Sequence, residues 1–103
     1  MQELKLALKV DRKDNVATIF AQDITNGCQV EVLDPSGQSQ VFTVIGDVPY
    51  GHKIALEDIP QGSPIVKYGH TIGAASCPIR AGEYVHVHNL EALRGRGDLN
   101  KEG

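Results

Sequence analysis

The chain has 103 residues, with 13 acidic and 10 basic side chains and a formal net charge of −3. This length fits one domain with a thin core, and the acidic balance argues against a nucleic-acid-binding protein, which would carry a basic stripe. No segment is long and apolar enough to span a membrane, and the first residues lack the layout of a secretory signal, so we expect a cytoplasmic chain.

Short strands are predicted along the chain in order. Leu4, Leu6, Leu8 and Val10 alternate with other residues, which predicts a first strand whose leucine face lies on the core. After a polar turn, apolar runs bounded by glycine or proline predict strands at residues 16–20, 29–33, 40–45, 53–56, 65–68 and 83–89. Residues 90–93 fit one helical turn, and residues 94–103 fit a flexible tail that follows a domain at residues 1–93.

A turn motif recurs three times between these strands. Isoleucine, then glycine three residues later, then valine or isoleucine three residues further occurs at Ile24/Gly27/Val30, Ile59/Gly62/Ile65 and Ile79/Gly82/Val85. In each copy we expect the isoleucine to enter the core, the glycine to take a positive φ, and the branched residue to begin a strand. The pattern supports an all-β fold, and its use is structural.

The last copy leads into two histidines. In an extended strand His86 and His88 would lie on one face, roughly 6.5 to 7 Å apart along the backbone, with Val85 and Val87 toward the core. Two imidazoles in that arrangement can bind an ion or transfer protons near neutral pH. A polar outer face is the other interpretation, and a metal would need further ligands from elsewhere.

Other basic groups lie beside glycines. His52 and Lys53 follow Gly51 in a region rich in turns, and Lys67 precedes Gly69 at a strand end. Loops held on a rigid sheet are where binding groups concentrate, and lysine can hold a carboxylate or act as a base. The serines lack any recognisable triad context, and no phosphate-binding loop is present, so neither hydrolysis nor nucleotide-driven chemistry is supported.

Taken in order, these motifs resemble a known family, the amino-terminal SAF domain of the altronate and galactarate dehydratases. The resemblance spans about residues 4–93, and the segments that carry it are DNVA at 14–17, GHKIAL at 51–56, IVKYG at 65–69, IG at 72–73 and GEYVHVHN at 82–89. It implies a β-clip fold, similar to type III antifreeze protein, and a hydro-lyase that converts a sugar acid to a 2-keto-3-deoxy acid.

The resemblance also implies roles and partners. His86 and His88 match its strand motif, which implies metal binding or proton transfer, with a divalent metal such as iron as cofactor. His52 and Lys53 match its glycine-histidine-lysine motif, and Lys67 its lysine-tyrosine-glycine motif, so these three are the predicted catalytic residues. A large catalytic subunit or domain is the implied partner, without which we expect no turnover. Exposed edge strands also favour self-association.

Two alternatives remain beside the sugar-acid dehydratase. The small subunit of sulfolactate sulfo-lyase belongs to the same group of relatives, and a free-standing small chain would suit it. A non-catalytic module could instead recognise a sugar acid or a partner surface, with the histidines supplying only hydrogen bonds.

Overall fold

The computed structural model describes residues 5–92, and the regular elements of this part of the chain are nine strands. They are β1 (Lys5–Leu8), β2 (Val16–Ile19), β3 (Gln29–Leu33), β4 (Ser39–Thr43), β5 (Lys53–Ala55), β6 (Pro64–Lys67), β7 (His70–Ala75), β8 (Tyr84–Val85) and β9 (Leu90–Ala92). The all-β prediction is confirmed. Within this range no helix is long and apolar enough to cross a membrane. The tail predicted at 94–103 lies outside the described residues.

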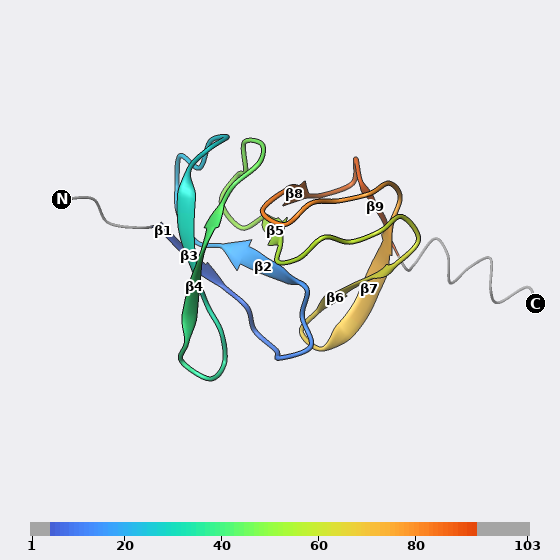
Figure 1. Cartoon of the computed structure of the whole chain (residues 1–103), viewed down its shortest axis with the longest axis horizontal. Helices are drawn as coiled ribbons and strands as arrows, with labels where there is room; N and C mark the ends of the chain where they lie inside the picture. Colours follow the sequence, from blue (N-terminus) through green and yellow to red (C-terminus); the bar gives the residue numbers. More distant parts are fainter. Residues whose placement is uncertain (1–4, 93–103) are drawn as a thin grey trace, which may run out of the picture.

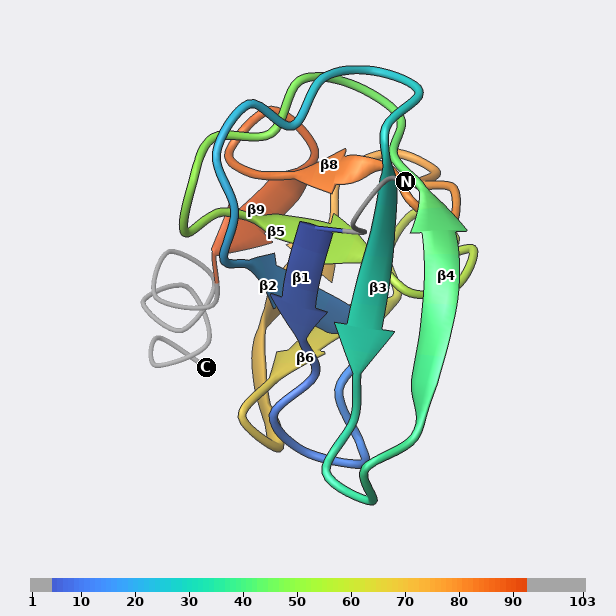
Figure 2. The same ribbon diagram turned by 90° about the vertical axis from the view of Figure 1, so that its left-hand side faces the viewer.

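Two sheets divide these strands. One has six strands in the order β4-β3-β1-β2-β5-β8, and the other has three in the order β6-β7-β9. Strand β1 pairs in parallel with β3 and antiparallel with β2. Figure 1 shows β1, β3 and β4 at one end of the molecule and β6, β7 and β9 at the other, with β2 and β5 between them. The same arrangement seen after a quarter turn places β1, β3 and β4 in front (Figure 2).

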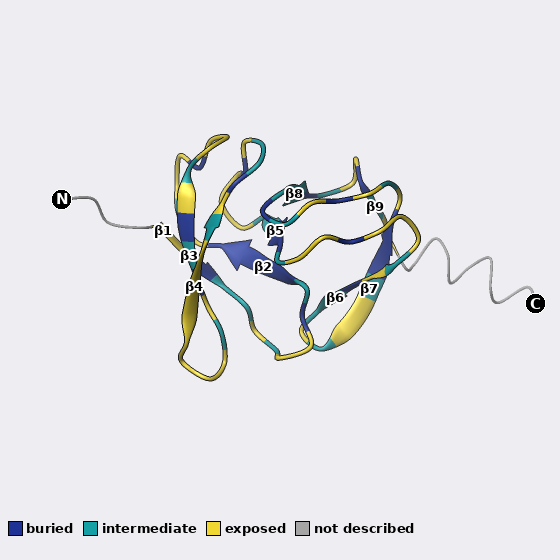
Figure 3. Ribbon diagram, viewed as in Figure 1, coloured by how far each residue is buried: buried dark blue, intermediate teal, exposed yellow. Residues whose placement is uncertain are grey.

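Two separate clusters of buried side chains form the core. Ala7, Ile19 and Val30 belong to the first, which lies within the six-stranded sheet, whereas Val16 and Ile65 belong to the second, which joins β2, β5 and β8 to β6 and β7. Strand β2 is buried along its whole length because its alternate faces serve different clusters (Figure 3). The middle of the molecule, where β2 and β5 pair, therefore contributes side chains to both clusters.

The first strand exposes the face that was predicted to be buried. Ala7 is fully buried, whereas Leu6 is 40% exposed and Val10 is 47% exposed. The reason is register, because Ala7 pairs with Ile19 on one side and with Val32 on the other, and both of these face the first cluster. A second correction concerns residues 90–92, which form β9 rather than a helical turn and pair antiparallel with β7.

The recurring turn behaves as predicted, and a further copy of it exists. The three isoleucines are 2–3% exposed, the residues that begin strands are fully buried, and Gly27, Gly62 and Gly82 have φ near +90°. Val48/Gly51/Ile54 repeats the pattern with valine in place of isoleucine and with φ of 84° at Gly51. In each copy the glycine N–H donates to a carbonyl of a distant strand, at Val44, Ile19, Ala75 or Ala55.

These four turns form two pairs that are joined by isolated β-bridges. Ile24 bridges to Val48, and Ile59 bridges to Ile79. The turn at 48–51 delivers His52 to the start of β5, and the turn at 79–82 delivers Tyr84 to the start of β8. Because β5 and β8 are antiparallel neighbours, with Ile54 opposite Tyr84, the two turns converge on one edge of the six-stranded sheet.

Candidate functional site

A histidine and a tyrosine meet at the end of this sheet. Nδ1 of His52 lies 2.7 Å from the hydroxyl oxygen of Tyr84, which is a short hydrogen bond between partly buried groups. Each residue comes from a different glycine turn, so the geometry is fixed by the backbone of β5 and β8 rather than by flexible side chains. The hydrogen bond occupies one ring nitrogen of His52 and leaves Nε2 to face other groups.

Two further imidazoles surround this pair. The ring centroids of His52 and His86 are 4.5 Å apart, and the rings of Tyr84 and His86 are nearly parallel at 5.8 Å. The ring centroids of His88 and Tyr84 are 5.3 Å apart. We call these four residues the imidazole cluster. It brings together three of the five predicted site residues and adds Tyr84, which is their shared neighbour.

The two histidines after β8 lie on a turn rather than on a strand. Strand β8 ends at Val85, and residues 87–89 turn, so the predicted strand at 83–89 is wrong beyond its first part. Val85 is fully buried as predicted, but Val87, which was predicted to face the core, is 78% exposed. On this turn the rings of His86 and His88 each lie beside the ring of Tyr84.

A buried asparagine closes this turn. Asn89 is 1% exposed, its Oδ1 accepts the His86 N–H at 3.0 Å, and its Nδ2 donates to the Tyr84 carbonyl at 2.9 Å. The N–H groups of Asn89 and Leu90 both donate to the His86 carbonyl. With the side chain fully paired, the turn is held at both ends, and the imidazoles are presented on a fixed frame.

The electrostatic environment keeps one imidazole neutral. Partial burial is the main cause that lowers the pKa of His86, and the positive charges of His52, Lys53 and His88 lower it further. All four causes act in the same direction, since no carboxylate among the described residues contributes. Near neutral pH His86 is therefore available as a proton acceptor and as a hydrogen-bond acceptor for a ligand.

Lys53 lies on β5, the strand between β2 and β8 in the six-stranded sheet. It begins β5 opposite Thr18 on one side and Val85 on the other. Burial lowers the pKa of Lys53, and the charge of Lys67 adds to that effect. Since successive side chains along a strand point to opposite faces, Lys53 leaves the backbone away from His52, yet its charge still reaches His86.

Lys67 is the predicted residue that the fold separates from the others. It ends β6, and it pairs with His70 across the turn to β7. In both views of the ribbon this turn lies at the lower edge of the molecule, whereas β8 lies toward the upper edge (Figures 1 and 2). The ammonium of Lys67 lies 4.8 Å from the ring centroid of Tyr68.

Sequence reasoning missed Tyr84 and Asn89, and both had a signal. Tyr84 is two residues before His86, so the alternation used to pair His86 with His88 also places Tyr84 on their face. Asn89 ends the motif and was read as part of the strand, although asparagine is depleted in strands and common in turns. The Val48/Gly51/Ile54 copy, missed because it starts with valine, would have linked His52 to the same kind of turn.

The imidazole cluster falls short of a metal site. Within residues 5–92 no group of three or more histidine, cysteine, aspartate or glutamate side chains is arranged to hold a metal ion. The rings of His86 and His88 each lie beside Tyr84, at angles of 11° and 55° to it, and His52 is tilted by 43° from His86. The metal-binding role predicted for His86 and His88 stays a prediction, and it would need ligands beyond these two residues.

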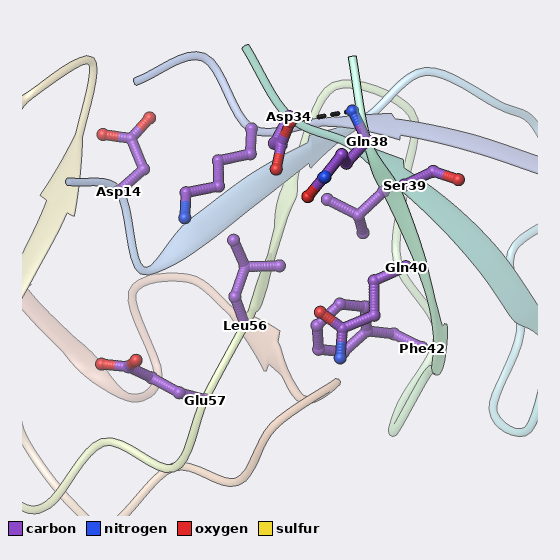
Figure 4. Close-up of a pocket in the computed structure, with 10 residues that line it drawn as sticks. Asp14, Asp34, Gln38, Ser39, Gln40, Phe42, Leu56 and Glu57 are labelled. Atoms are coloured by element: carbon purple, nitrogen blue, oxygen red, sulfur yellow. Dashed lines mark hydrogen bonds between the residues drawn. The ribbon is translucent and has the colours of Figure 1, made fainter. Parts of the chain in front are cut away.

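One hollow in the described part of the chain is lined by other residues. A cavity of about 190 Å³ lies between the β3–β4 hairpin and the segments around Asp14 and Leu56. Figure 4 shows Asp14, Asp34 and Glu57 around it, with Asp34 accepting the Gln38 N–H at 3.1 Å. None of the five predicted site residues lines it. His88 is exposed and the other three members of the imidazole cluster are only partly buried, so the cluster lies at the surface and needs a second wall to enclose a substrate.

Fold and site together define a small all-β domain that presents a cluster of imidazole and phenol groups at its surface. The family model of the altronate/galactarate dehydratase SAF domain matches residues 5–93. The chain belongs to this family, and the resemblance proposed from its motifs is confirmed.

Its relatives differ greatly in length. The chain is 43% identical over 82 residues to the altronate dehydratase of Escherichia coli (strain K12), covering 80% of this chain but 15% of that protein. It is 43% identical over 88 residues to the altronate dehydratase of Bacillus subtilis (strain 168), covering 85% of this chain and 16% of that protein. The chain thus spans about a sixth of the length of these enzymes.

One relative is itself a small chain. The (2R)-sulfolactate sulfo-lyase subunit alpha of Chromohalobacter salexigens is 34% identical over 86 residues, which covers 82% of this chain and 90% of that subunit. The family therefore includes this domain both as a small part of a long dehydratase and as nearly the whole of a separate subunit.

Proposed function

We propose that the chain acts with a larger catalytic subunit or domain as part of a hydro-lyase that dehydrates a sugar acid of the altronate or galactarate type. The observation that supports this most is the imidazole cluster, in which His52 and His86 lie 4.5 Å apart around Tyr84. The names of the relatives in E. coli and B. subtilis point to the same reaction class. The larger part would supply the second wall that the open face requires.

The proposed reaction is an elimination in two stages. A base takes the proton on the carbon next to the carboxylate, and the β-hydroxyl leaves as water after it gains a proton. The resulting enol rearranges to the 2-keto-3-deoxy acid, so atoms and charge balance without an external oxidant. Neutral His86 suits the first transfer, because its lowered pKa keeps the imidazole unprotonated near neutral pH.

His52 and Tyr84 suit the second transfer. In its imidazolium form His52 would donate from Nδ1 to the Tyr84 oxygen and pass the Nε2 proton to the leaving hydroxyl, which leaves a neutral imidazole. The hydrogen bond with Tyr84 would hold the ring in place for this transfer. Lys53 and Lys67 would stabilise the negative charge that develops on the carboxylate side of the substrate.

Any divalent metal in this enzyme would need ligands beyond those described. The resemblance implies a metal such as iron, yet the histidines in residues 5–92 do not converge as a metal site does. We propose that the larger part holds most of the ligands. Metal analysis of the isolated chain should then find far less than one equivalent after dialysis, and a full equivalent would contradict this assignment.

A hybrid enzyme tests the proposed function. The chain would replace the matching amino-acid segment of E. coli altronate dehydratase, and dehydration of altronate would be followed by formation of the 2-keto product. We expect His86→Gln to lower kcat by about a hundredfold. His70→Gln is the matched control, since His70 is an exposed histidine on β7. A rate unchanged by His86→Gln in an active hybrid would refute a catalytic role and leave a binding module.

Sulfolactate sulfo-lyase is the second candidate. The observation that favours it is the 90% coverage of the subunit alpha in C. salexigens, which is a chain of nearly this size. The same groups could serve, because sulfolactate is also a hydroxy acid with an anionic carboxylate and loses a β-substituent. Assays with altronate and sulfolactate on the chain expressed together with each type of large partner would separate the two.

A further inference from the structure

One face of the six-stranded sheet carries large apolar side chains that stay exposed. Leu6, Phe20, Leu33 and Val41 are each between 37% and 47% exposed. Apolar residues that are exposed one by one are common in soluble proteins and need no explanation, whereas a contiguous group of them marks a surface for interaction. Whether these four side chains lie together is therefore decisive, and the strand register answers it.

The register places these side chains on one face. Val41 on β4 is opposite Glu31 on β3, and Glu31 is beside Leu6 on β1. The Phe20 N–H donates to the Leu6 carbonyl at 2.9 Å, which continues the pairing of β1 with β2. Residues paired across strands share a face of the sheet, and so do residues two apart in one strand. We call this set the outer face: Leu6, Phe20, Glu31, Leu33 and Val41.

The other side of the same strands faces the core. Ala7, Val30 and Val32 alternate with outer-face residues along β1 and β3, and all three belong to the first buried cluster. The outer face therefore points away from that cluster, on the side of the molecule where β1, β3 and β4 lie in front in Figure 2. Its side chains are exposed because the register turns them outward.

An exposed aromatic pair extends this face toward the turn that delivers His52. The ring centroids of Phe20 and Tyr50 are 6.0 Å apart, and the rings meet edge to face at 82°. Tyr50 is 54% exposed and lies two residues before His52. Together with Tyr50, the apolar members of the outer face expose roughly 400–500 Å², and contiguous apolar patches of that order are often functional.

One carboxylate lies within the outer face. Glu31 is partly buried between Val41 and Leu6, and no described residue makes a hydrogen bond or an ion pair with its side chain. An apolar surface that covered this row would take water from the carboxylate, which costs free energy unless a cation replaces the water. The surface that fits the outer face is therefore apolar and carries a basic side chain opposite Glu31.

Size and charge favour the larger catalytic part over a second copy as the occupant. A stable complex of separate proteins buries about 800 Å² on each side, which exceeds this face. A part that also covers the imidazole cluster needs less area here. A two-fold copy centred on the row would place Glu31 opposite Leu6 or another Glu31, and neither pairs a carboxylate. The chain spans about a sixth of the related dehydratases, so in them this domain adjoins a much larger part.

We propose that the outer face docks onto the larger catalytic part, against an apolar surface that presents a basic side chain to Glu31. This inference rests on the proposed function for the existence of that larger part. It explains why β1 exposes Leu6 and buries the smaller Ala7. It also gives the exposed pair of Phe20 and Tyr50 a partner next to the turn that carries His52.

Photochemical cross-linking in the hybrid enzyme tests this docking. The photoreactive residue p-benzoylphenylalanine would replace Val41 in one variant and Gln40 in another. Both positions are exposed on β4, and because they are neighbours in a strand they report on opposite faces. After irradiation, mass spectrometry of the digested protein should find an adduct between position 41 and a peptide of the larger part, with far less of it from position 40.

A charge reversal tests the chemistry of the partner surface. Glu31→Lys should lower the yield of the adduct from position 41 by about threefold or more, because a lysine would then face a basic side chain. Glu57→Lys is the matched control, since Glu57 is an exposed glutamate that lines the cavity instead of the outer face. It should leave the yield unchanged. The isolated chain with Glu31→Lys should unfold within a few degrees of the unmodified chain, which excludes a folding defect.

Several results would overturn the inference. They are the absence of an adduct from position 41 in a folded hybrid, an adduct that joins position 41 to a second copy of this domain, equal yields from positions 40 and 41, and an unchanged yield in Glu31→Lys. Cross-linking needs no turnover, so the two proposals fail separately. An inactive hybrid that cross-links from position 41 would refute the proposed reaction and keep the docking face, whereas an active hybrid without this adduct would do the reverse.

Discussion

The turn after β8 and the turn between β6 and β7 are both held by a buried polar side chain, but their backbone conformations differ. Each is held by one buried polar side chain, Asn89 in the first and Asp14 in the second, and both side chains pair with backbone groups. The first presents His86 and His88 on a turn in which none of residues 86–89 has a positive φ. The second presents Lys67 beside Tyr68, which has a positive φ.

This difference separates two kinds of preorganisation. At the β8 turn, hydrogen bonds hold the backbone, and the imidazoles lie around Tyr84 without any residue of positive φ. At the β6–β7 turn, the frame is fixed and a residue is strained as well, which is a pattern typical of functional positions. A turn that is only structural would be expected to contain the residue that its backbone prefers.

Removal of the buried asparagine should have the largest effect on stability. Asn89→Ala leaves the His86 N–H and the Tyr84 carbonyl without their partners, so we expect a loss of about 2–4 kcal/mol in the free energy of unfolding. Urea denaturation measures it. Val87→Ala, in the same turn but exposed, is the control and should change stability by less than about 0.5 kcal/mol. Equal effects of the two would show that Asn89 does not hold the turn.

Removal of the buried aspartate should cost somewhat less. Asp14→Ala deprives the Gly69 and Asp11 N–H groups of their acceptor, but it also removes a charge from a buried place, so we expect about 1–3 kcal/mol. The same denaturation assay applies. Hydrogen exchange should show the Gly69 amide opening in this variant while the Asn89 amide stays protected. Opening of both turns together would contradict their independence.

The smallest effect is a dependence of stability on pH. His86 has a lowered pKa in the folded chain, so the unfolded chain binds its proton more readily. Stability should therefore be full above the unfolded pKa, near 6.5, and should decline as pH falls below it. Thermal unfolding at pH 7.5 and 5.5 measures the decline. In His86→Gln it should be smaller, whereas His70→Gln should retain it. An unchanged decline in His86→Gln would refute the assignment.

Local signals in the sequence predicted most of the fold. The isoleucine–glycine turns were placed correctly because a positive φ and a buried isoleucine are properties of a few adjacent residues. The face of β1 was not, since the burial of Ala7 depends on its pairing with Ile19 and Val32, which are distant in the chain. The alternation of leucines with other residues suggested that the leucine face would be buried, whereas the register of β1 buries Ala7.

Only part of the site was predicted, again because local patterns do not show which distant residues meet. His52 and His86 were both named, but their approach to 4.5 Å follows from the pairing of β5 with β8, which no local pattern reveals. The alternation of His86 and His88 suggested a strand, whereas the hydrogen bond from the His86 N–H to the Asn89 side chain holds this segment in a turn. Lys67 matched a family motif, yet the fold places it at the far edge.

A double-mutant cycle of kcat/KM in the hybrid enzyme tests the central claim most directly. His52→Gln and His86→Gln would be measured singly and together, with altronate as substrate. If the imidazole cluster acts as one unit, each single change lowers kcat/KM by about a hundredfold, and the double change costs little more than either. Two full losses that multiply in the double variant, or no loss in the single variants, would contradict the account.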